Sequence, residues 1–248
     1  MTRTKKMDAP RPRSVAGLAL IALVMVSVLV GLGVWQLHRK DEKRALIAAL
    51  TERLAAAPVA LLPKSQWQNL NPARDEFRRV TFLGTFVALP EANVYSSGSA
   101  LRTDISGLGT FVFSPARLAN EDIVVINRGF VPDGAVVKAN VSREPIALTG
   151  YIRFPEKAGW FTPNEDAAKR LWFLRDHVAM AKVYHWGEVA PFYIDLETPA
   201  PASGLPKPGP LQVHLKDDHL QYAITWFGLA LAVAATFGFW IFGQRRAR

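Results

Sequence analysis

Histidines beside two long apolar runs are the side chains of this sequence best placed to do chemistry. His38 follows the first run, close to Trp35 and Gln36, and His219 opens the second. A neutral imidazole can bind a metal, and it exchanges protons near neutral pH. Polar residues are also common at the ends of membrane spans, so His219 has a second interpretation as an interfacial side chain paired with Asp218. The pattern alone favours this second interpretation.

Two kinds of side chain accompany these histidines. Tyr222 and Trp226 share a helical face with His219, because residues three or four positions apart stack on one side of a helix. Arg39 and Lys43 follow the first run four residues apart and can pair with anionic groups, arginine in a bidentate manner. Contact with lipid headgroups explains these two cations equally well. An aromatic at Trp35 is also typical of a membrane interface.

Motifs of the common enzyme classes are missing from the sequence. No GxSxG, HExxH or phosphate-binding loop occurs, and the glycine pair at 107–109 lacks the third glycine of a dinucleotide loop. The acidic pair Glu121-Asp122 is typical of a solvated loop. The absence of cysteine excludes disulfides, thiolate metal sites and c-type haem attachment. The sequence therefore predicts a protein that is not an enzyme.

Two stretches are long and apolar enough to be transmembrane helices, residues 14–37 and 219–243. A hydrocarbon core about 30 Å thick needs roughly 20 apolar residues at a rise of 1.5 Å each. The first stretch is too long for the apolar part of a signal peptide, and no small-x-small cleavage site follows it cleanly. We therefore expect a retained anchor and a two-span membrane protein in contact with lipid.

The charge distribution predicts the topology of these spans. The net charge is +9. Basic residues gather in the short tails 1–13 and 244–248 rather than beside nucleic-acid recognition elements, so a nucleic-acid partner is not expected. Cytoplasmic flanks of spans are enriched in Lys and Arg, which predicts that both termini are cytoplasmic. The basic residues at 39, 40, 43 and 44 oppose this assignment, but two spans force both ends to one side.

Residues 38–218 form the predicted domain between the spans, mainly antiparallel β with minor helices. A helical start is expected over 41–57, a short helix with Asp176 as its N-cap over 176–186, and a stiff proline-rich linker over 198–210. A turn is expected at Pro132-Asp133-Gly134. The predicted strands are residues 79–87, 92–96, 109–114, 123–131, 146–154, 171–174 and 192–195. The fold class is thus an α+β membrane protein, with two transmembrane helices flanking a mainly antiparallel β domain.

Small residues in the two spans predict how the spans pack together. Gly228, Ala232 and Ala235 form a stripe in the second span, and Ser27 and Gly31 form its counterpart in the first. In lipid, such stripes allow helix backbones to approach closely. Acidic residues before His219 are expected to cap the second helix.

Taken together, the segments resemble the surfeit locus protein one family, whose members are assembly factors of haem–copper cytochrome c oxidase. The similarity runs nearly end to end, and VVINRGFVP at 124–132 is its most diagnostic segment. The other matching segments are LGVWQL at 32–37 with Arg39, KRALI at 43–47, RV at 79–80, GTF at 84–86, GYIR at 150–153, FTPN at 161–164, Trp172, Arg175-Asp176 and HLQYAITWF at 219–227. Phe130 departs from the family, which often has Trp there, and so does Asp217-Asp218, where bacterial members often have Asn.

The resemblance implies that haem A is bound as cargo. In bacterial members the histidine that opens the second span is implicated in haem A binding, and His219 matches it. Tyr222, Trp226, Trp35, Gln36 and Arg39 would complete the pocket, with the farnesyl chain of the haem along the Gly/Ala stripe. His38, which the family motif does not cover, is a speculative second axial ligand. A partial positive charge at a helix N-terminus suits the anionic propionates.

Other residues of the matching segments have simpler explanations. For Arg128, a structural turn next to Gly129 is favoured over a partner or haem contact. Trp172, Arg175 and Asp176 indicate a packed aromatic ring and a helix cap. His177, His185 and His214 are scattered singly along the chain.

The resemblance also implies partners and a location. The partners would be the catalytic subunit of cytochrome c oxidase and haem A synthase. The location would be a bacterial inner membrane, with the central domain periplasmic. The alternatives are a haem-independent scaffold that stabilises an oxidase assembly intermediate and, with less support, a membrane-anchored periplasmic enzyme.

Overall fold

A computed structural model describes residues 15–99, 101–135, 137, 144–160, 163, 165–166, 169–213 and 217–246. It divides into two compact units, and each is described separately below. The helical unit comprises Met1–Leu46 and Lys216–Arg248, and the β domain comprises Ile47–Leu215. The predicted tail 1–13, His214, Lys216 and three residues of the FTPN segment lie outside the described residues.

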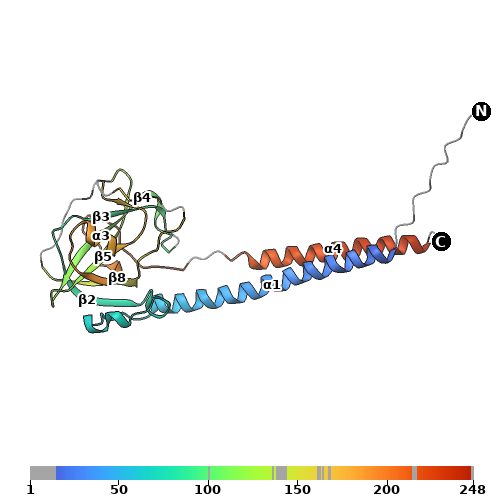
Figure 1. Ribbon diagram of the computed structural model, residues 1–248, viewed down its shortest axis with the longest axis horizontal. Coiled ribbons are helices and arrows are strands. Elements are labelled where there is room, and N and C mark those ends of the chain that lie inside the picture. The colour runs from blue at the N-terminus through green and yellow to red at the C-terminus, as the bar shows by residue number, and fades with distance from the viewer. Residues whose placement is uncertain are drawn as a thin grey trace, which may run out of the picture. The chain divides into compact units, whose positions relative to one another are not determined.

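Two long helices, α1 (Val15–Ala55) and α4 (His219–Arg246), provide the helical unit (Figure 1). Both are long and apolar enough to cross a membrane, with mean hydropathies of 2.7 and 1.8, and only 6% of each apolar window is buried. Such exposure is unlike that of a core helix. The helix α1 is about 60 Å long at 1.5 Å per residue, twice the bilayer core, and its charged second half continues without a break from the apolar first half.

The two helices pack together, but not along the predicted small-residue stripe. A Cβ added at Gly31 or Gly228 would meet nothing within 4 Å, whereas a Cβ at Gly33 would lie 2.6 Å from the ring of Phe227. Ala223 and Ala230 are buried. The prediction that Gly228 lies at the closest contact is therefore wrong, while Ala232 of the same stripe lines a groove beside that contact. The helix α4 meets α1 with the side that carries Ala223, Phe227 and Ala230, and the Phe227 ring fills the space beside Gly33.

The β domain is built on one sheet of eight strands among the described residues. The strands are β1 (Val59–Ala60), β2 (Arg79–Phe86), β3 (Ala92–Gly98), β4 (Ser106–Leu118), β5 (Ile123–Pro132), β6 (Ile146–Arg153), β7 (Leu171–Trp172) and β8 (Val189–Thr198). Short helices η1 (Lys64–Asn69), α2 (Pro72–Asp75) and α3 (His177–Val183) complete it. Asp176 caps α3 by accepting a hydrogen bond from the Ala179 amide at 3.0 Å, as predicted.

The strand order β1-β2-β6-β8-β5-β4-β3-β7, with an additional β2–β4 pairing, closes β2, β6, β8, β5 and β4 into a ring. Most pairings are antiparallel, but β1–β2, β3–β7 and β5–β8 are parallel. The predicted fold class is confirmed: two apolar helices flank a mixed, mostly antiparallel sheet with minor helices. Expected strands at 109–114 and 192–195 are the centres of the longer β4 and β8.

The central strands are buried on both faces. Val124 and Ile126 of β5 belong to one apolar cluster with residues of β2, β6 and β8, while Val125 between them belongs to a second cluster beneath α3. All three are fully buried. Side chains alternate across a strand, so a strand buried on both sides shows a continuous apolar run rather than alternation.

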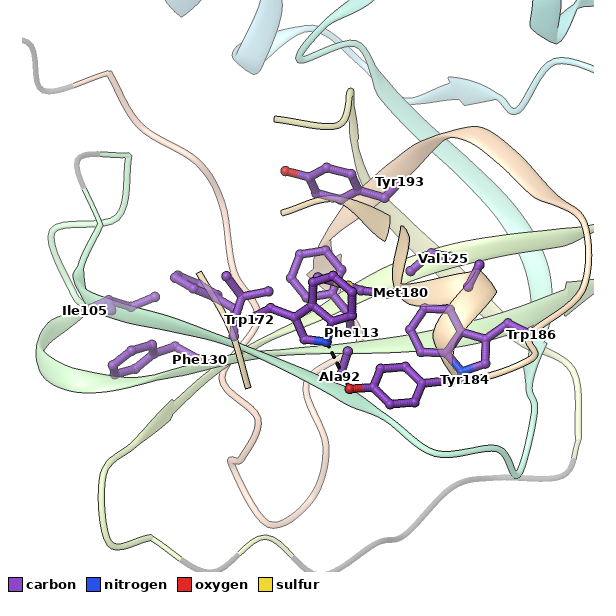
Figure 2. Close-up of a cluster of buried hydrophobic side chains, with 13 residues drawn as sticks. Ala92, Ile105, Phe113, Val125, Phe130, Trp172, Met180, Tyr184, Trp186 and Tyr193 are labelled. Carbon is purple, nitrogen blue, oxygen red and sulfur yellow. Dashed lines mark hydrogen bonds between the residues drawn. The ribbon is translucent and has the colours of Figure 1, made fainter. Parts of the chain in front are cut away.

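The second cluster is rich in aromatic rings (Figure 2). Within it the Trp172 indole N–H donates to the Tyr184 hydroxyl at 2.9 Å, a bond between β7 and the end of α3. The predicted role of Trp172 as a packed aromatic is confirmed. In Figure 2 the Tyr193 hydroxyl lies at the edge of the group, and its ring packs against Phe113 at a centroid distance of 5.2 Å.

The predicted linker at 198–210 is not a free connection, and this prediction is wrong. Pro206 and Leu211 are buried, and Lys207 forms an antiparallel bridge with Phe130 of β5. Gly129, at a φ of 120°, lies so close to this segment that a Cβ there would overlap the Lys207 carbonyl. Prolines stiffen the segment, but their rings also supply apolar surface, and that surface covers the domain.

Candidate functional site

A hydrogen bond joins the end of the apolar half of α1 to the first residue of α4. The His219 Nδ1 lies 2.8 Å from the Gln36 Oε1, and both side chains are half-buried. A carbonyl oxygen only accepts, so Nδ1 carries the proton and Nε2 keeps its lone pair. Within the part of the chain that the structure describes, the hydrogen bonds of His219 do not involve Nε2. An imidazole in this state is prepared to bind a metal through Nε2.

The start of α4 is held by a second set of contacts. The Asp217 side chain accepts from the His219 backbone N–H at 3.2 Å, the predicted cap. Its other carboxylate oxygen lies 3.9 Å from Arg44 Nε of α1. Asp217 therefore fixes the first residue of α4 and links it to α1, so that the orientation of His219 depends on both helices.

The remaining predicted pocket residues are distributed unevenly around this pair. Tyr222 and Trp226 lie on the same side of α4 as His219; Tyr222 is exposed and Trp226 is half-buried. Arg39 is exposed and pairs with Glu42 at 2.6 Å. Trp35 is 53% exposed. His38 is exposed, and two residues from Gln36 it lies on the opposite face of α1, so the structure does not bring it to His219.

In the β domain, Arg128 is engaged in structural contacts. Its guanidinium donates to a Glu91 carboxylate oxygen that also accepts from the Ser114 hydroxyl. The same group lies over the Phe86 ring at 5.1 Å. Arg128 is 7% exposed, and this set of partners supports the structural interpretation of the Asn-Arg-Gly segment.

A second buried network surrounds Asp195 of β8. One carboxylate oxygen accepts from Asn127 at 2.6 Å and the other from Arg153 at 2.9 Å, and Arg153 also donates to Glu76. Burial by itself would lower the pKa of Arg153, but the carboxylates of Asp195 and Glu76 raise it. Asn127 and Arg153 belong to segments that carry the resemblance, but the sequence does not show that they meet Asp195 and Glu76, because the four members lie on four separate segments.

Two buried polar atoms of the β domain have no hydrogen-bond partner among the described residues, His177 Nδ1 and the Tyr193 hydroxyl. His177 Nε2 lies 2.9 Å from the Ala190 carbonyl, and burial lowers the pKa of this imidazole. Burial likewise raises the pKa of the Tyr193 hydroxyl. Both rings pack at a centroid distance of 5.4 Å, which describes a neutral, tightly packed pair.

Clustered metal ligands do not occur in the described residues, where no three or more His, Cys, Asp or Glu side chains could hold a metal ion together. A metal site of the multi-ligand type is therefore not found among them. Haem iron has its own four porphyrin nitrogens, and a single protein histidine suffices to hold it. What the described residues offer at this place is a single nitrogen donor, His219 Nε2, which takes part in neither hydrogen bond of this residue.

Comparison with known proteins identifies the family of this chain. The model of the SURF1 family matches residues 23–231. The chain belongs to the SURF1 family. It is similar to a SURF1-like protein of Monosiga brevicollis, with 31% identity over 241 residues that cover 91% of this chain and 87% of that protein.

Vertebrate members of the SURF1 family are about as similar. Surfeit locus protein 1 of Gallus gallus is 32% identical over 217 residues, 82% of this chain and 68% of that protein. Surfeit locus protein 1 of Homo sapiens is 30% identical over 231 residues, 86% of this chain and 74% of that protein. The SURF1 match includes the β domain, Gln36 and His219, so the joined helix ends lie inside the family region.

Proposed function

We propose that this protein is an assembly factor for haem–copper cytochrome c oxidase that binds haem A and assists its delivery to the catalytic subunit. Membership of the SURF1 family supports the assembly role. Two apolar helices are compatible with a membrane-anchored protein. The proposed location is a bacterial inner membrane, in which the basic tails favour cytoplasmic termini and so a periplasmic β domain, and haem A synthase is the proposed donor.

The observation that carries the proposal is the Gln36–His219 hydrogen bond. It orients the imidazole, assigns the proton to Nδ1 and leaves Nε2 for the iron. The ring lies at the first residue of α4, where free backbone N–H groups favour the anionic propionates. Arg39 and Arg44, both largely exposed on α1, add positive charge at the same end of the helical unit.

A site of this kind suits a carrier rather than a permanent haem protein. His219 is half-buried, and Tyr222 beside it is 56% exposed. One protein ligand at an open site holds a lipophilic porphyrin less firmly than a closed pocket with two ligands. The haem can therefore leave for a better-ligated site in the oxidase.

The decisive experiment is a haem measurement on full-length protein purified from cells that make haem A. The wild-type protein is expected to show a Soret band and a haem A pyridine haemochrome. His219→Ala is expected to lose most of the bound haem. His38→Ala is the matched control, because it removes an imidazole close to Gln36 in the sequence but on the opposite face of α1. Full haem occupancy in His219→Ala would refute His219 as the ligand.

A haem-independent scaffold is the second candidate, and the same hydrogen bond favours it. Polar side chains that bond between spans also hold membrane helices together. Gln36 and His219 would then serve only to fix the hairpin of α1 and α4. Wild-type protein that supports oxidase assembly but carries no haem after purification would select this function over haem delivery.

A further inference from the structure

A groove of about 450 Å³ runs between α1 and α4, far from His219 along both helices. Its walls are almost entirely apolar, with Ala22 and Met25 on α1 and Ala232, Thr236 and Trp240 on α4. The Trp240 ring stacks on Phe237 at 5.7 Å, which gives one wall a rigid aromatic surface. The volume lies within the range of about 300–1,000 Å³ that is typical of small-molecule sites.

The groove lies beyond the close approach of Gly33 and Phe227. Closer to His219, Gly33 and the Phe227 ring keep the backbones together, and Ala230 is buried in the contact. Beyond this point each helix contributes an alanine to the lining, Ala22 and Ala232, and these short side chains leave room for the groove. The groove therefore results from the positions of small residues along the two helices.

One flank of the helix pair connects the groove to the Gln36–His219 pair. On α4, Tyr222, Trp226, Leu229 and Val233 follow one another at spacings of three and four, and Val233 lines the groove. On α1, residues 25, 29, 32, 36 and 39 are spaced in the same way, beginning in the groove and passing Gln36. Residues at these spacings lie on one side of a helix.

The distance along the helices from the Gln36–His219 pair to the groove matches the length of a lipid-like tail. Met25 and Ala232 lie about 16 Å and about 20 Å along their helices from Gln36 and His219, at 1.5 Å per residue. A tail of three isoprene units, with a dozen carbons in line, reaches roughly 15 Å if each bond advances about 1.2 Å as in an extended chain. The porphyrin edge adds to this reach, so the tail ends inside the groove.

We propose that this groove binds the isoprenoid tail of the haem whose iron His219 holds, an inference that rests on the proposed function. The tail follows the Tyr222–Val233 flank, and its end packs against Met25 and Ala232 at the near end of the groove. The groove thereby selects haems that carry a farnesyl chain over haems that lack one. The imidazole by itself does not distinguish haem O from haem B, because neither carries the formyl group that alters the iron.

The test compares three haems on full-length protein in lipid nanodiscs by Soret titration. Haem B has no tail, haem O has the tail without the formyl group, and haem A has both. Wild-type protein is expected to bind haems A and O at least tenfold more tightly than haem B. Ala232→Phe fills the groove and is expected to reduce binding of haems A and O to the level of haem B, with haem B binding unchanged.

Two further variants make the result specific. Ala234→Phe adds the same ring at an exposed position outside the groove and is expected to preserve the preference. Met25→Trp fills the groove from α1, so the test does not depend on one substitution. Unchanged haem B binding by Ala232→Phe and Met25→Trp shows that both variants are folded.

The outcomes separate this inference from the proposed function. Equal affinity of wild-type protein for the three haems, or a preference that survives both groove-filling variants, overturns the tail site while His219 remains the ligand. Such a result would mean that ordinary lipid chains or a partner helix occupy the groove. Failure of every haem to bind wild-type protein overturns both proposals together.

Discussion

The Asp195 network of the β domain and the His219–Gln36 pair of the helical unit use similar polar groups in opposite ways. Each oxygen of the Asp195 carboxylate has a donor, from Asn127 and from Arg153. His219, in contrast, is bonded only on one ring nitrogen of its side chain within the described chain. A buried carboxylate whose two oxygens both have donors contributes to folding, whereas an oriented imidazole with one unbonded nitrogen can also accept a ligand.

The largest effect is expected from breaking the buried Asp195 network. Asp195→Ala leaves the Arg153 guanidinium, 9% exposed in the folded domain, with one carboxylate fewer. Removing one partner of a buried ion pair typically costs about 3–5 kcal/mol in the free energy of unfolding. Urea unfolding of the full-length protein, followed by tryptophan fluorescence, measures this loss.

The control for this variant is Arg117→Ala, which removes an exposed pair with Glu121 in the same domain. Exposed ion pairs contribute about 0–1 kcal/mol. If the two variants lose the same free energy of unfolding, burial of the Asp195 network does not distinguish it from a surface pair.

The second prediction concerns the orientation of His219. Gln36→Leu removes the acceptor for Nδ1, so the imidazole loses its fixed orientation and proton position. Loss of such a supporting partner typically weakens metal binding about 10–100-fold. We expect this loss in a haem A titration, with no decrease in the unfolding free energy of the β domain.

Gln36→Glu is the matched variant, because a carboxylate also accepts the Nδ1 proton. It is expected to restore most of the haem affinity that Gln36→Leu loses. Equal haem binding by wild-type protein and Gln36→Leu would show that this hydrogen bond only holds the two helices together.

The third prediction tests the corrected packing face. Gly33→Leu forces a side chain into the ring of Phe227, whereas a Cβ at Gly31 meets nothing within 4 Å, so Gly31→Leu is the control. Overpacking of this kind costs about 1–3 kcal/mol. The chain has no cysteine, so spin labels on cysteines introduced at 37 and 220 report only the helix ends. Their distance distribution is expected to broaden in Gly33→Leu and to remain that of wild type in Gly31→Leu.

The smallest effect is a pH dependence of the β domain. Burial lowers the pKa of His177 below its ordinary value of 6.5, so the unfolded chain takes up the proton first as pH falls. Stability from this residue is therefore complete above about pH 6.5 and decreases below it, by at most about 1.4 kcal/mol per pH unit. Urea unfolding at pH 7.5 and pH 5.5 should show a smaller difference in His177→Gln than in wild type.

The matched control is His185→Gln, which replaces an exposed histidine two residues beyond α3. Its difference in unfolding free energy between the two pH values should equal that of wild type. A loss of the pH dependence in both variants would show that the effect does not come from burial of His177.

Local pattern was sufficient for much of the fold. Two uncharged runs predict the apolar helices, and β-branched stretches such as 123–131 predict strands close to those observed. Asp176 before a short amphipathic run predicts the cap of α3. These features depend on residues within a few positions of one another, which the chain order displays directly.

Contacts between distant segments required the three-dimensional fold. Residues 198–210 have the composition of a linker, yet the bridge between Lys207 and Phe130 and the close approach to Gly129 make them part of the domain. The spans were expected to meet at Gly228, and they meet at Gly33. A stripe of small residues predicts that a helix can pack closely against another. The side chains of the other helix decide which stripe makes the contact.

The candidate site divides in the same way. The choice of His219, Gln36 and Tyr222 follows from their positions at the ends of two apolar runs and from the family resemblance. Which nitrogen of His219 is free, and why His38 takes no part, follow from the rotation of two antiparallel helices about their axes. That rotation depends on side-chain packing along the whole contact, and no single segment of the chain contains this information.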